Sequence, residues 1–106
     1  MRPRQKNRVG RPCLKRQIEF DPKITYFKPR GVNVSSLEII ELSSEELEAV
    51  RLKNLKEYNQ SMCAKKMHTS PATIQRILEK ANKKIAEALI EGKAIKIIKN
   101  YDSKKL

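Results

Sequence analysis

The sequence predicts a mainly α-helical protein with minor β structure: a three-helix helix-turn-helix domain, a few short strands and a disordered basic N-terminal arm. Two helical patterns between Asn59 and Leu89 meet at a turn of only a few residues. Capping signals stand at the expected helix starts, and β-type residues flank the helices on both sides. At 106 residues the chain fits one domain, residues 17–100, with tails at 1–16 and 101–106.

The net charge limits the class of partner. Lysine and arginine number 24 against 12 acids, which gives a net charge of +12 and a pI near 10.0. An excess of this size attracts polyanions, so nucleic acid is the first candidate and an anionic membrane surface the second. No apolar run exceeds three residues, and the N-terminus lacks the apolar core of a signal peptide. We therefore expect a cytoplasmic protein with no membrane partner.

The N-terminal arm, residues 1–16, contains seven basic residues and no acid, and proline and glycine interrupt any helix. This composition predicts disorder. Residues 8–12, RVGRP, resemble the Gly-Arg-Pro core of an AT-hook, which would place Arg8 and Arg11 along an A·T minor groove. The alternative is a solvated basic tail that adds only non-sequence-specific attraction.

Residues 17–42 are expected to form an N-terminal lobe of strands. The β-type residues predict one short strand from Ile24 to Lys28 and a second from Glu38 to Leu42. Tyr26 and Phe27 are expected to fill the core of this lobe, with stacking on bases as the alternative.

The head of three helices spans residues 43–91, and its first helix is expected from Ser43 to Lys56. Ser43 can cap the third helical residue while the Glu46 side chain reaches back, which is a capping box. The first turn is rich in acids, where the helix dipole favours them. Its apolar side chains, expected to support the other two helices, are Leu47, Val50, Leu52 and Leu55.

Two more helices are expected from Asn59 to Met67 and from Pro71 to Glu91. Asn59 and Ser70 can cap them, and proline at the first helical position gives up an N–H that has no partner there. His68 stands in the turn, where such motifs usually carry a glycine in the left-handed conformation. The buried faces are predicted to be Cys63, Ala64 and Met67 on the first of these helices, and Ile74, Ile77, Leu78, Ala81, Ile85 and Leu89 on the second.

The opposite face of the third helix carries groups that can address base edges and phosphates. They are Ser70, Thr73, Gln75, Arg76, Glu79, Lys80 and Lys83. Gln75 suits adenine and Arg76 suits guanine by bidentate geometry, although either can take a phosphate instead. The residues expected to contact the phosphate backbone are Lys65, Lys66, Lys80, Lys83 and Lys84. The alternative is a helical hairpin that only packs a core.

After Gly92, residues Lys93 to Lys99 predict a C-terminal edge strand guarded by lysines, with Ile95 and Ile97 on one face. A strand edge offers unpaired backbone groups, and one reading head covers few base pairs. We therefore expect a symmetric homodimer.

No catalytic, metal or cofactor site is expected, and the chain is not expected to be an enzyme. Cys13 and Cys63 are fifty residues apart, and His68 is the single histidine, so one chain cannot supply a zinc ligand set. Cys63 lies on a predicted apolar face and is expected to be a small core residue.

Four segments resemble a known family in order and spacing. They are Tyr26-Phe27-Lys28-Pro29, residues 47–52 (LEAVRL), Arg76-Ile77-Leu78 and residues 91–95 (EGKAI). Over roughly Arg16 to Ile98 the chain resembles uncharacterised protein family 0251, also called domain of unknown function 134. The family consists of short prokaryotic proteins predicted to bind DNA, with a helical part similar to region 4 of sigma factors. The resemblance implies that the DNA-facing positions are Ser70, Pro71, Ala72, Thr73, Gln75 and Arg76.

The sequence therefore predicts a sequence-specific double-stranded DNA-binding protein, a transcriptional regulator that reads the major groove with the helix starting at Pro71. Two alternatives stay open. One is a sigma-like adaptor that docks on RNA polymerase or another transcription protein. The other is RNA binding, for which the sequence lacks aromatic stacking platforms.

Overall fold

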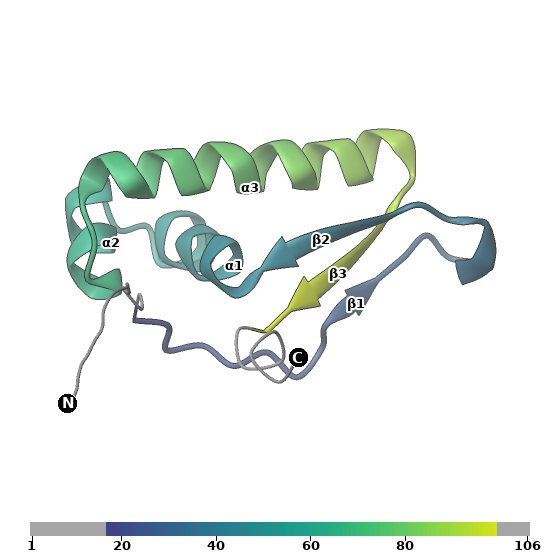
Figure 1. Ribbon diagram of the computed structural model, residues 1–106, viewed down its shortest axis with the longest axis horizontal. Helices are drawn as coiled ribbons and strands as arrows, with labels where there is room; N and C mark the ends of the chain where they lie inside the picture. Colours follow the sequence, from purple (N-terminus) through teal and green to yellow (C-terminus); the bar gives the residue numbers. More distant parts are fainter. Residues whose placement is uncertain (1–16, 100–106) are drawn as a thin grey trace, which may run out of the picture.

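The computed structural model describes residues 17–99, and the predictions for the arm at 1–16 and the tail at 101–106 lie outside them. The protein is mainly α with minor β, as predicted, and Figure 1 shows the long helix α3 running above α1 and the sheet. In chain order the elements are β1 (Tyr26–Phe27), the 3-10 turn η1 (Val34–Ser36), β2 (Ile39–Ser43), α1 (Ser44–Val50), the π-helical segment η2 (Arg51–Leu55), α2 (Gln60–Met67), α3 (Pro71–Glu91) and β3 (Ala94–Ile98).

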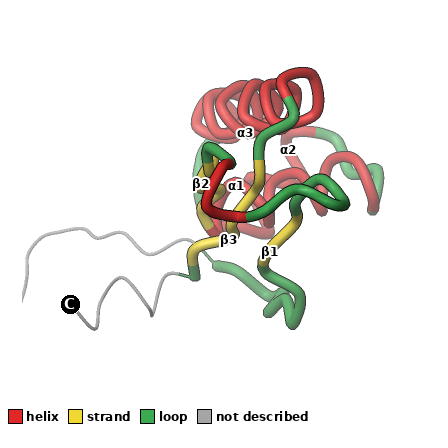
Figure 2. Tube along the Cα trace, turned by 90° about the vertical axis from the view of Figure 1, so that its right-hand side faces the viewer, coloured by secondary structure: helices red, strands yellow, loops and turns green. Residues whose placement is uncertain are grey.

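The three strands form one sheet in the order β1-β3-β2. β3 pairs antiparallel with β1 and parallel with β2, in a register that places Ile40 opposite Ile95 and Leu42 opposite Ile97. The parallel pair needs a long crossover, and α1, α2 and α3 provide it (Figure 2). The prediction of an edge strand at 93–99 was therefore wrong, because β3 is the central strand.

The two N-terminal strands are shorter or shifted relative to the prediction. β1 has two residues instead of five, and β2 begins and ends one residue later than expected. β2 extends to Ser43 because this residue is both the last strand residue and the N-cap of α1. Ser43 Oγ accepts from Glu46 N at 3.1 Å, and Glu46 Oε1 accepts from Ser43 N at 2.9 Å, which confirms the capping box.

The first helix changes geometry halfway along its predicted length. α1 ends at Val50 and the chain continues as a π-helix to Leu55, with Glu57 in the left-handed region at φ 62°. A π turn takes an extra residue, so later positions rotate away from the α-helical stripe. Leu52 is buried, whereas Leu55 is 76% exposed and does not join the predicted apolar face.

The core consists of two adjoining clusters that share α1 and α3. One holds α1, α2 and α3 together and contains Ala49, Leu52, Cys63, Ala64, Met67, Ile74 and Leu78. The other, formed by Leu42, Ala81 and Ile97, joins the sheet to α3, with Ile85 and Ile95 packed against it. The buried faces predicted for the two helices of the α2–α3 unit are confirmed except at the end of α3.

Besides Leu55, three residues predicted to be buried are exposed. Leu89 points to solvent and Ala88 occupies the buried position in the last turn of α3. Tyr26 and Phe27 are exposed because β1 is a two-residue edge strand that pairs with β3 alone. The prediction that these two aromatics fill a core was therefore wrong.

Candidate nucleic-acid interface

The turn between α2 and α3 is closed by backbone hydrogen bonds and a left-handed histidine. Asn59 caps α2 through Oδ1, which accepts from Met62 N at 2.8 Å. His68 has φ 57° and ψ 51°, and Thr69 N donates to Ala64 O at 2.9 Å. A non-glycine residue in this conformation costs about 1–2 kcal/mol. The predicted left-handed geometry at His68 is thus confirmed, and the bonds at the C-terminus of α2 hold it.

Ser70 fixes the start of α3 and occupies its own hydroxyl in doing so. Its Oγ accepts from Thr73 N at 3.1 Å and donates to Thr73 Oγ1 at 2.9 Å, and Pro71 takes the first helical position. Thr73 is half-buried, whereas Ser70 and Pro71 are exposed. Ser70 is therefore at the surface, but its hydroxyl is already hydrogen-bonded to the hydroxyl of Thr73.

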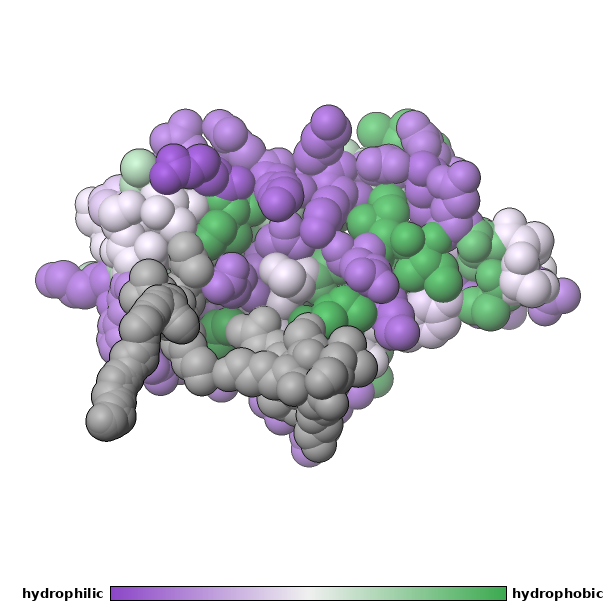
Figure 3. Space-filling model, viewed as in Figure 1, coloured by the Kyte–Doolittle hydropathy of each residue, from purple (hydrophilic) through white to green (hydrophobic). Residues whose placement is uncertain are grey.

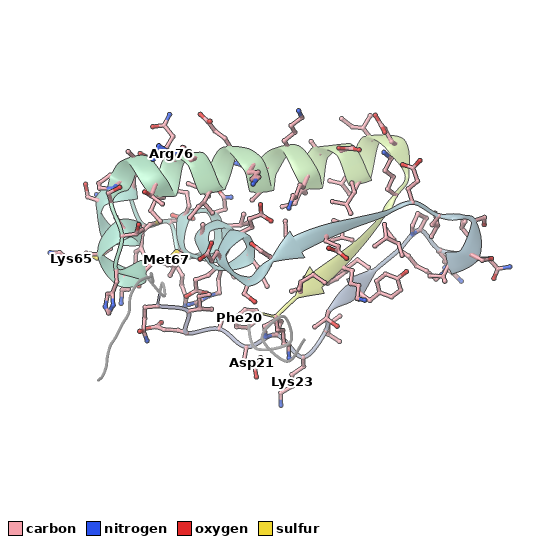
Figure 4. The ribbon with its side chains drawn as sticks, in the orientation of Figure 1. Phe20, Asp21, Lys23, Lys65, Met67 and Arg76 are labelled. Atoms are coloured by element: carbon pink, nitrogen blue, oxygen red, sulfur yellow. The ribbon has the colours of Figure 1, made fainter. Side chains whose placement is uncertain are left out.

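The outward side of α3 carries most of the predicted contact residues. Ile74, Leu78 and Ala81 are buried against the domain. The exposed residues on the other side are Ala72, Gln75, Arg76, Glu79, Lys80 and Lys83. Arg76 lies near the α2 end of the helix (Figure 4), and Gln75 Nε2 donates to Glu79 Oε2 at 3.4 Å. Arg76 and Lys80 are thus presented to solvent without burial.

The charge on this end of the domain is one-sided. No acid occurs from Tyr58 to Leu78, a stretch that covers α2, the turn and the first two turns of α3. Lys65 and Lys66 are exposed on α2, and Lys66 Nζ lies 5.5 Å from the centre of the Tyr58 ring. Figure 3 shows hydrophilic side chains along most of the visible face of α3. This end of the molecule therefore attracts anions.

Lys84, which the sequence placed among the phosphate contacts, is engaged elsewhere. Its Nζ lies 2.8 Å from Glu46 Oε1 and donates to Glu41 O at 2.8 Å. Glu46 is almost fully buried, so its carboxylate needs a cationic partner, and Lys84 supplies it. Lys84 serves the packing of α3 on α1, and the prediction for it was wrong.

Residues 17–20 attach the N-terminal segment to α1 and α2. Gln17 N donates to Met67 O at 3.1 Å, and Glu19 N donates to Glu48 Oε2 at 3.2 Å. Arg51 pairs with Glu48 through Nε and Oε1 at 2.9 Å, and its guanidinium lies 5.5 Å from the centre of the Phe20 ring. Gln17 therefore lies beside the C-terminus of α2, next to the turn between α2 and α3.

Sequence reasoning missed the role of Glu48, which was counted only among the acids of the first helical turn that the helix dipole favours. Burial acts to raise the pKa of Glu48, but the hydrogen bonds from Arg51 and from the backbone N–H of Glu19, with the charge of Arg51, hold it below its ordinary value. The spacing of Glu48 and Arg51, three residues apart on a helix, was the available signal. It indicated a pair, but not that the pair would be buried.

Neither a metal-binding cluster nor a membrane-spanning helix occurs within residues 17–99. No cluster of three or more His, Cys, Asp or Glu side chains that could hold a metal ion occurs there. Burial raises the pKa of the Cys63 thiol, as expected for a core residue. Within the same residues, none of the helices combines the length and the apolar content needed to cross a bilayer.

Comparison with known proteins relates the chain to bacterial proteins of unknown function. It is 48% identical to a UPF0251 protein of Halothermothrix orenii over 88 residues, which cover 83% of this chain and 65% of the relative. Identity is 47% with a relative from Desulforudis audaxviator (84% and 58% covered) and 46% with one from Clostridium beijerinckii (92% and 66% covered).

The chain thus spans about 58–66% of the length of these relatives. No solved structure matches it. The family described as protein of unknown function DUF134 matches residues 5–106. The chain belongs to this family, DUF134, whose relatives carry the name UPF0251.

Proposed function

We propose that the protein binds double-stranded DNA in a sequence-specific way and regulates transcription in the cytoplasm, with α2 and α3 acting as a helix-turn-helix. The observation that carries this proposal is the acid-free, cationic surface of α2 and the first turns of α3. Such a surface attracts a polyanion, and a helix of this exposure fits the major groove of B-DNA.

The exposed residues divide into base and backbone contacts. Arg76 and Gln75 extend from the second turn of α3 and have the donor geometry for guanine and adenine. Ala72 can contact a thymine methyl group, and Pro71 stands beside it at the start of the helix. Ser70 and Thr73 would have to exchange their mutual hydrogen bond for one to DNA. Lys65, Lys66, Lys80 and Lys83 would hold phosphates, which position the protein without reading sequence.

The basic segment before residue 17 is proposed to extend this surface. The hydrogen bond from Gln17 N to Met67 O starts that segment beside the turn between α2 and α3. Seven cations precede Gln17 in the sequence. We propose that two of them, Arg8 and Arg11, contact the adjacent minor groove, where A·T tracts have the most negative potential.

A second candidate function, a sigma-like adaptor on RNA polymerase or another transcription protein, is favoured by exposed apolar residues beside α2. Leu55 and Met62 are both exposed there. A protein contact through these residues would not need the cationic face of α3. Its affinity would also depend weakly on salt, whereas DNA binding depends on it steeply.

Selection from a random pool of duplexes tests the proposed function directly. The full chain is immobilised, and the bound duplexes are sequenced after several rounds of selection. A sequence-specific protein enriches a short motif, and the same selection with Arg76→Ala should lose preference at one base pair of that motif. Recovery of the unselected distribution by the full chain would contradict specific DNA reading and leave the adaptor as the better account.

A further inference from the structure

The outward side of α3 carries a carboxylate among its cations. The exposed residues on this side lie opposite the buried stripe of the helix, and because they are three to four positions apart they form one row. The row consists of Ala72, Gln75, Arg76, Glu79, Lys80 and Lys83. Glu79 lies in the middle of this row and is the first acid after the acid-free stretch from Tyr58 to Leu78. A helix that enters a groove of DNA with this side brings Glu79 toward the DNA together with Arg76.

A carboxylate at this place is unsuited to the DNA backbone but suited to one kind of base edge. Phosphates are negative and accept hydrogen bonds, and an ionised carboxylate is negative and has no donor. In the major groove, by contrast, the exocyclic amino group of cytosine donates hydrogen bonds, and glutamate is the side chain that pairs with it. Glu79 is therefore compatible with a cytosine and incompatible with a phosphate.

The carboxylate of Glu79 keeps most of its capacity to accept hydrogen bonds. Among residues 17–99, its polar contact is the bond that Gln75 Nε2 donates to Glu79 Oε2, at 3.4 Å. The two oxygens of a carboxylate offer about four acceptor sites, so Oε1 remains free for a base. The acids near the other end of α3 differ, because Glu87 and Glu91 are both paired with Lys93.

We propose that Glu79 is a specificity-determining residue of the proposed DNA contact, and that its carboxylate accepts a hydrogen bond from the exocyclic amino group of a cytosine in the major groove. The inference rests on the proposed function and adds a base that the helix recognises. Glu79 acts in two ways. It binds the cytosine, and it disfavours duplexes without a donor at this place, since a carboxylate that loses water and gains no hydrogen bond is unfavourable.

The geometry of the helix places this cytosine near the base read by Arg76. Glu79 follows Arg76 by three residues, which is about 4.5 Å along the helix axis. Stacked base pairs are about 3.4 Å apart. The cytosine should therefore lie one or two base pairs from the guanine of Arg76. Gln75 can still contact an adenine, because its second amide hydrogen and its carbonyl oxygen are not used by the bond to Glu79.

Two variants of the full chain test the role of Glu79. Glu79→Ala and the matched control Glu41→Ala each remove one exposed carboxylate, so both make the chain more cationic to the same extent. Glu41 lies on β2, outside the proposed contact. Each protein is titrated against the motif that the parent selects and against duplexes with single base-pair changes. Melting curves should coincide closely with that of the parent, because exposed positions change stability little.

Glu79→Ala should lose about fivefold or more of the parent's preference for one G·C pair, which corresponds to the lower end of a specific base contact. It should also bind duplexes without that cytosine more tightly than the parent does. Glu41→Ala should keep every preference of the parent.

The outcomes separate this inference from the proposed function. A Glu79→Ala protein that keeps all preferences of a sequence-specific parent would contradict the cytosine contact and leave the proposed DNA binding intact. Loss of preference at an adenine instead would also contradict it, because Glu79 would then act only by orienting Gln75. If the parent itself selects no motif, the proposed function fails and the cytosine contact fails with it.

Discussion

The first and last turns of α3 belong to one continuous helix but present different surfaces. At the α2 end, Arg76 and Lys80 are exposed, and the stretch from Tyr58 to Leu78 contains no acid, although Glu79 follows it next to Lys80. At the other end, Glu87 and Glu91 surround Lys93 at 2.7 and 3.0 Å, and Leu89 and Ile90 are exposed. The contrast shows that the position of a residue along a helix, as well as the helix face it lies on, decides whether its side chain is free to contact a partner.

The physical chemistry of the helix ends explains the arrangement around Lys93. Carboxylates near a helix C-terminus are unfavourable because they meet the negative end of the helix dipole. Hydrogen bonds from Lys93, then its charge, hold the pKa of Glu87 below its ordinary value, and Lys83 contributes a smaller part. The hydrogen bonds that Lys93 donates to Glu38, Glu87 and Glu91 raise the pKa of Lys93. The charged side chains at this end therefore pair with one another, whereas the cations at the α2 end remain available to a charged partner.

The largest expected effect comes from truncating a buried residue at the α2 end. Ile74→Ala removes volume between α2 and α3 and should lower the free energy of unfolding by about 2–5 kcal/mol. The matched variant Leu89→Ala at the other end should change it by no more than about 0.5 kcal/mol in the monomer. Denaturant unfolding at low protein concentration measures both. Equal losses would mean that the two ends of α3 are packed alike.

A smaller loss is expected where the N-terminal segment is fastened to α1. Arg51→Ala leaves the buried carboxylate of Glu48 without its cation and should cost about 2–3 kcal/mol. Because the pKa of Glu48 is lowered by folding, its contribution is fully present above the unfolded value of about 4.3 and is lost as the pH falls through the folded value.

The loss of folding stability at acid pH tests this contribution of Glu48. Glu48→Gln should flatten the loss of stability below about pH 4.3, since the titrating group is gone. Glu57→Gln, at an exposed position in the turn before α2, is the control and should leave the pH dependence of the parent in place. A Glu48→Gln curve that keeps the full acid limb would mean that other carboxylates dominate it.

Deleting the basic N-terminal segment tests whether it adds to the DNA contact of the cationic α2 end. Removal of residues 1–16 deletes seven cations. The slope of log affinity against log salt for a duplex should become shallower, by as much as about 6 if every cation neutralises a phosphate. Filter binding across a salt series gives the slope. An unchanged slope would show that this segment does not touch DNA.

Local signals in the sequence predicted the helices better than the sheet. The capping residues Ser43, Asn59 and Ser70, and the spacing of Ile74, Leu78 and Ala81, located the helices because these features act within one or two turns. The central position of β3 depends on pairing with two distant segments, which its own residues do not specify. An isolated KAIKIIK run therefore looks like an edge strand.

In the candidate site, too, features set by local sequence were predicted and features set by distant contacts were not. The exposure of Arg76 and Lys80 follows from the helix period, and the structure has them as predicted. Lys84 belongs to the same helix and the same residue type, yet it pairs with Glu46 on α1. That contact joins residues 38 positions apart, so only the packing of α3 on α1 could reveal it. The same holds for Glu48, whose carboxylate accepts a hydrogen bond from the backbone N–H of Glu19, 29 positions earlier.

Whether the α2 end of α3 reads DNA is tested most directly by a pair of single-charge variants. Arg76→Ala and Lys23→Ala each remove one exposed cation, and the two residues lie on opposite sides of the domain (Figure 4). Both proteins should melt as the parent does. Each is titrated against the selected duplex and against duplexes with single base-pair changes.

Arg76→Ala should weaken binding to the preferred duplex by about 1–3 kcal/mol and relax the choice at one base pair, whereas Lys23→Ala should bind nearly as the parent does. Equal weakening on all duplexes would reduce Arg76 to a phosphate contact. If Arg76→Ala binds every duplex as tightly as the parent, α3 is not a recognition helix and the proposed function is wrong.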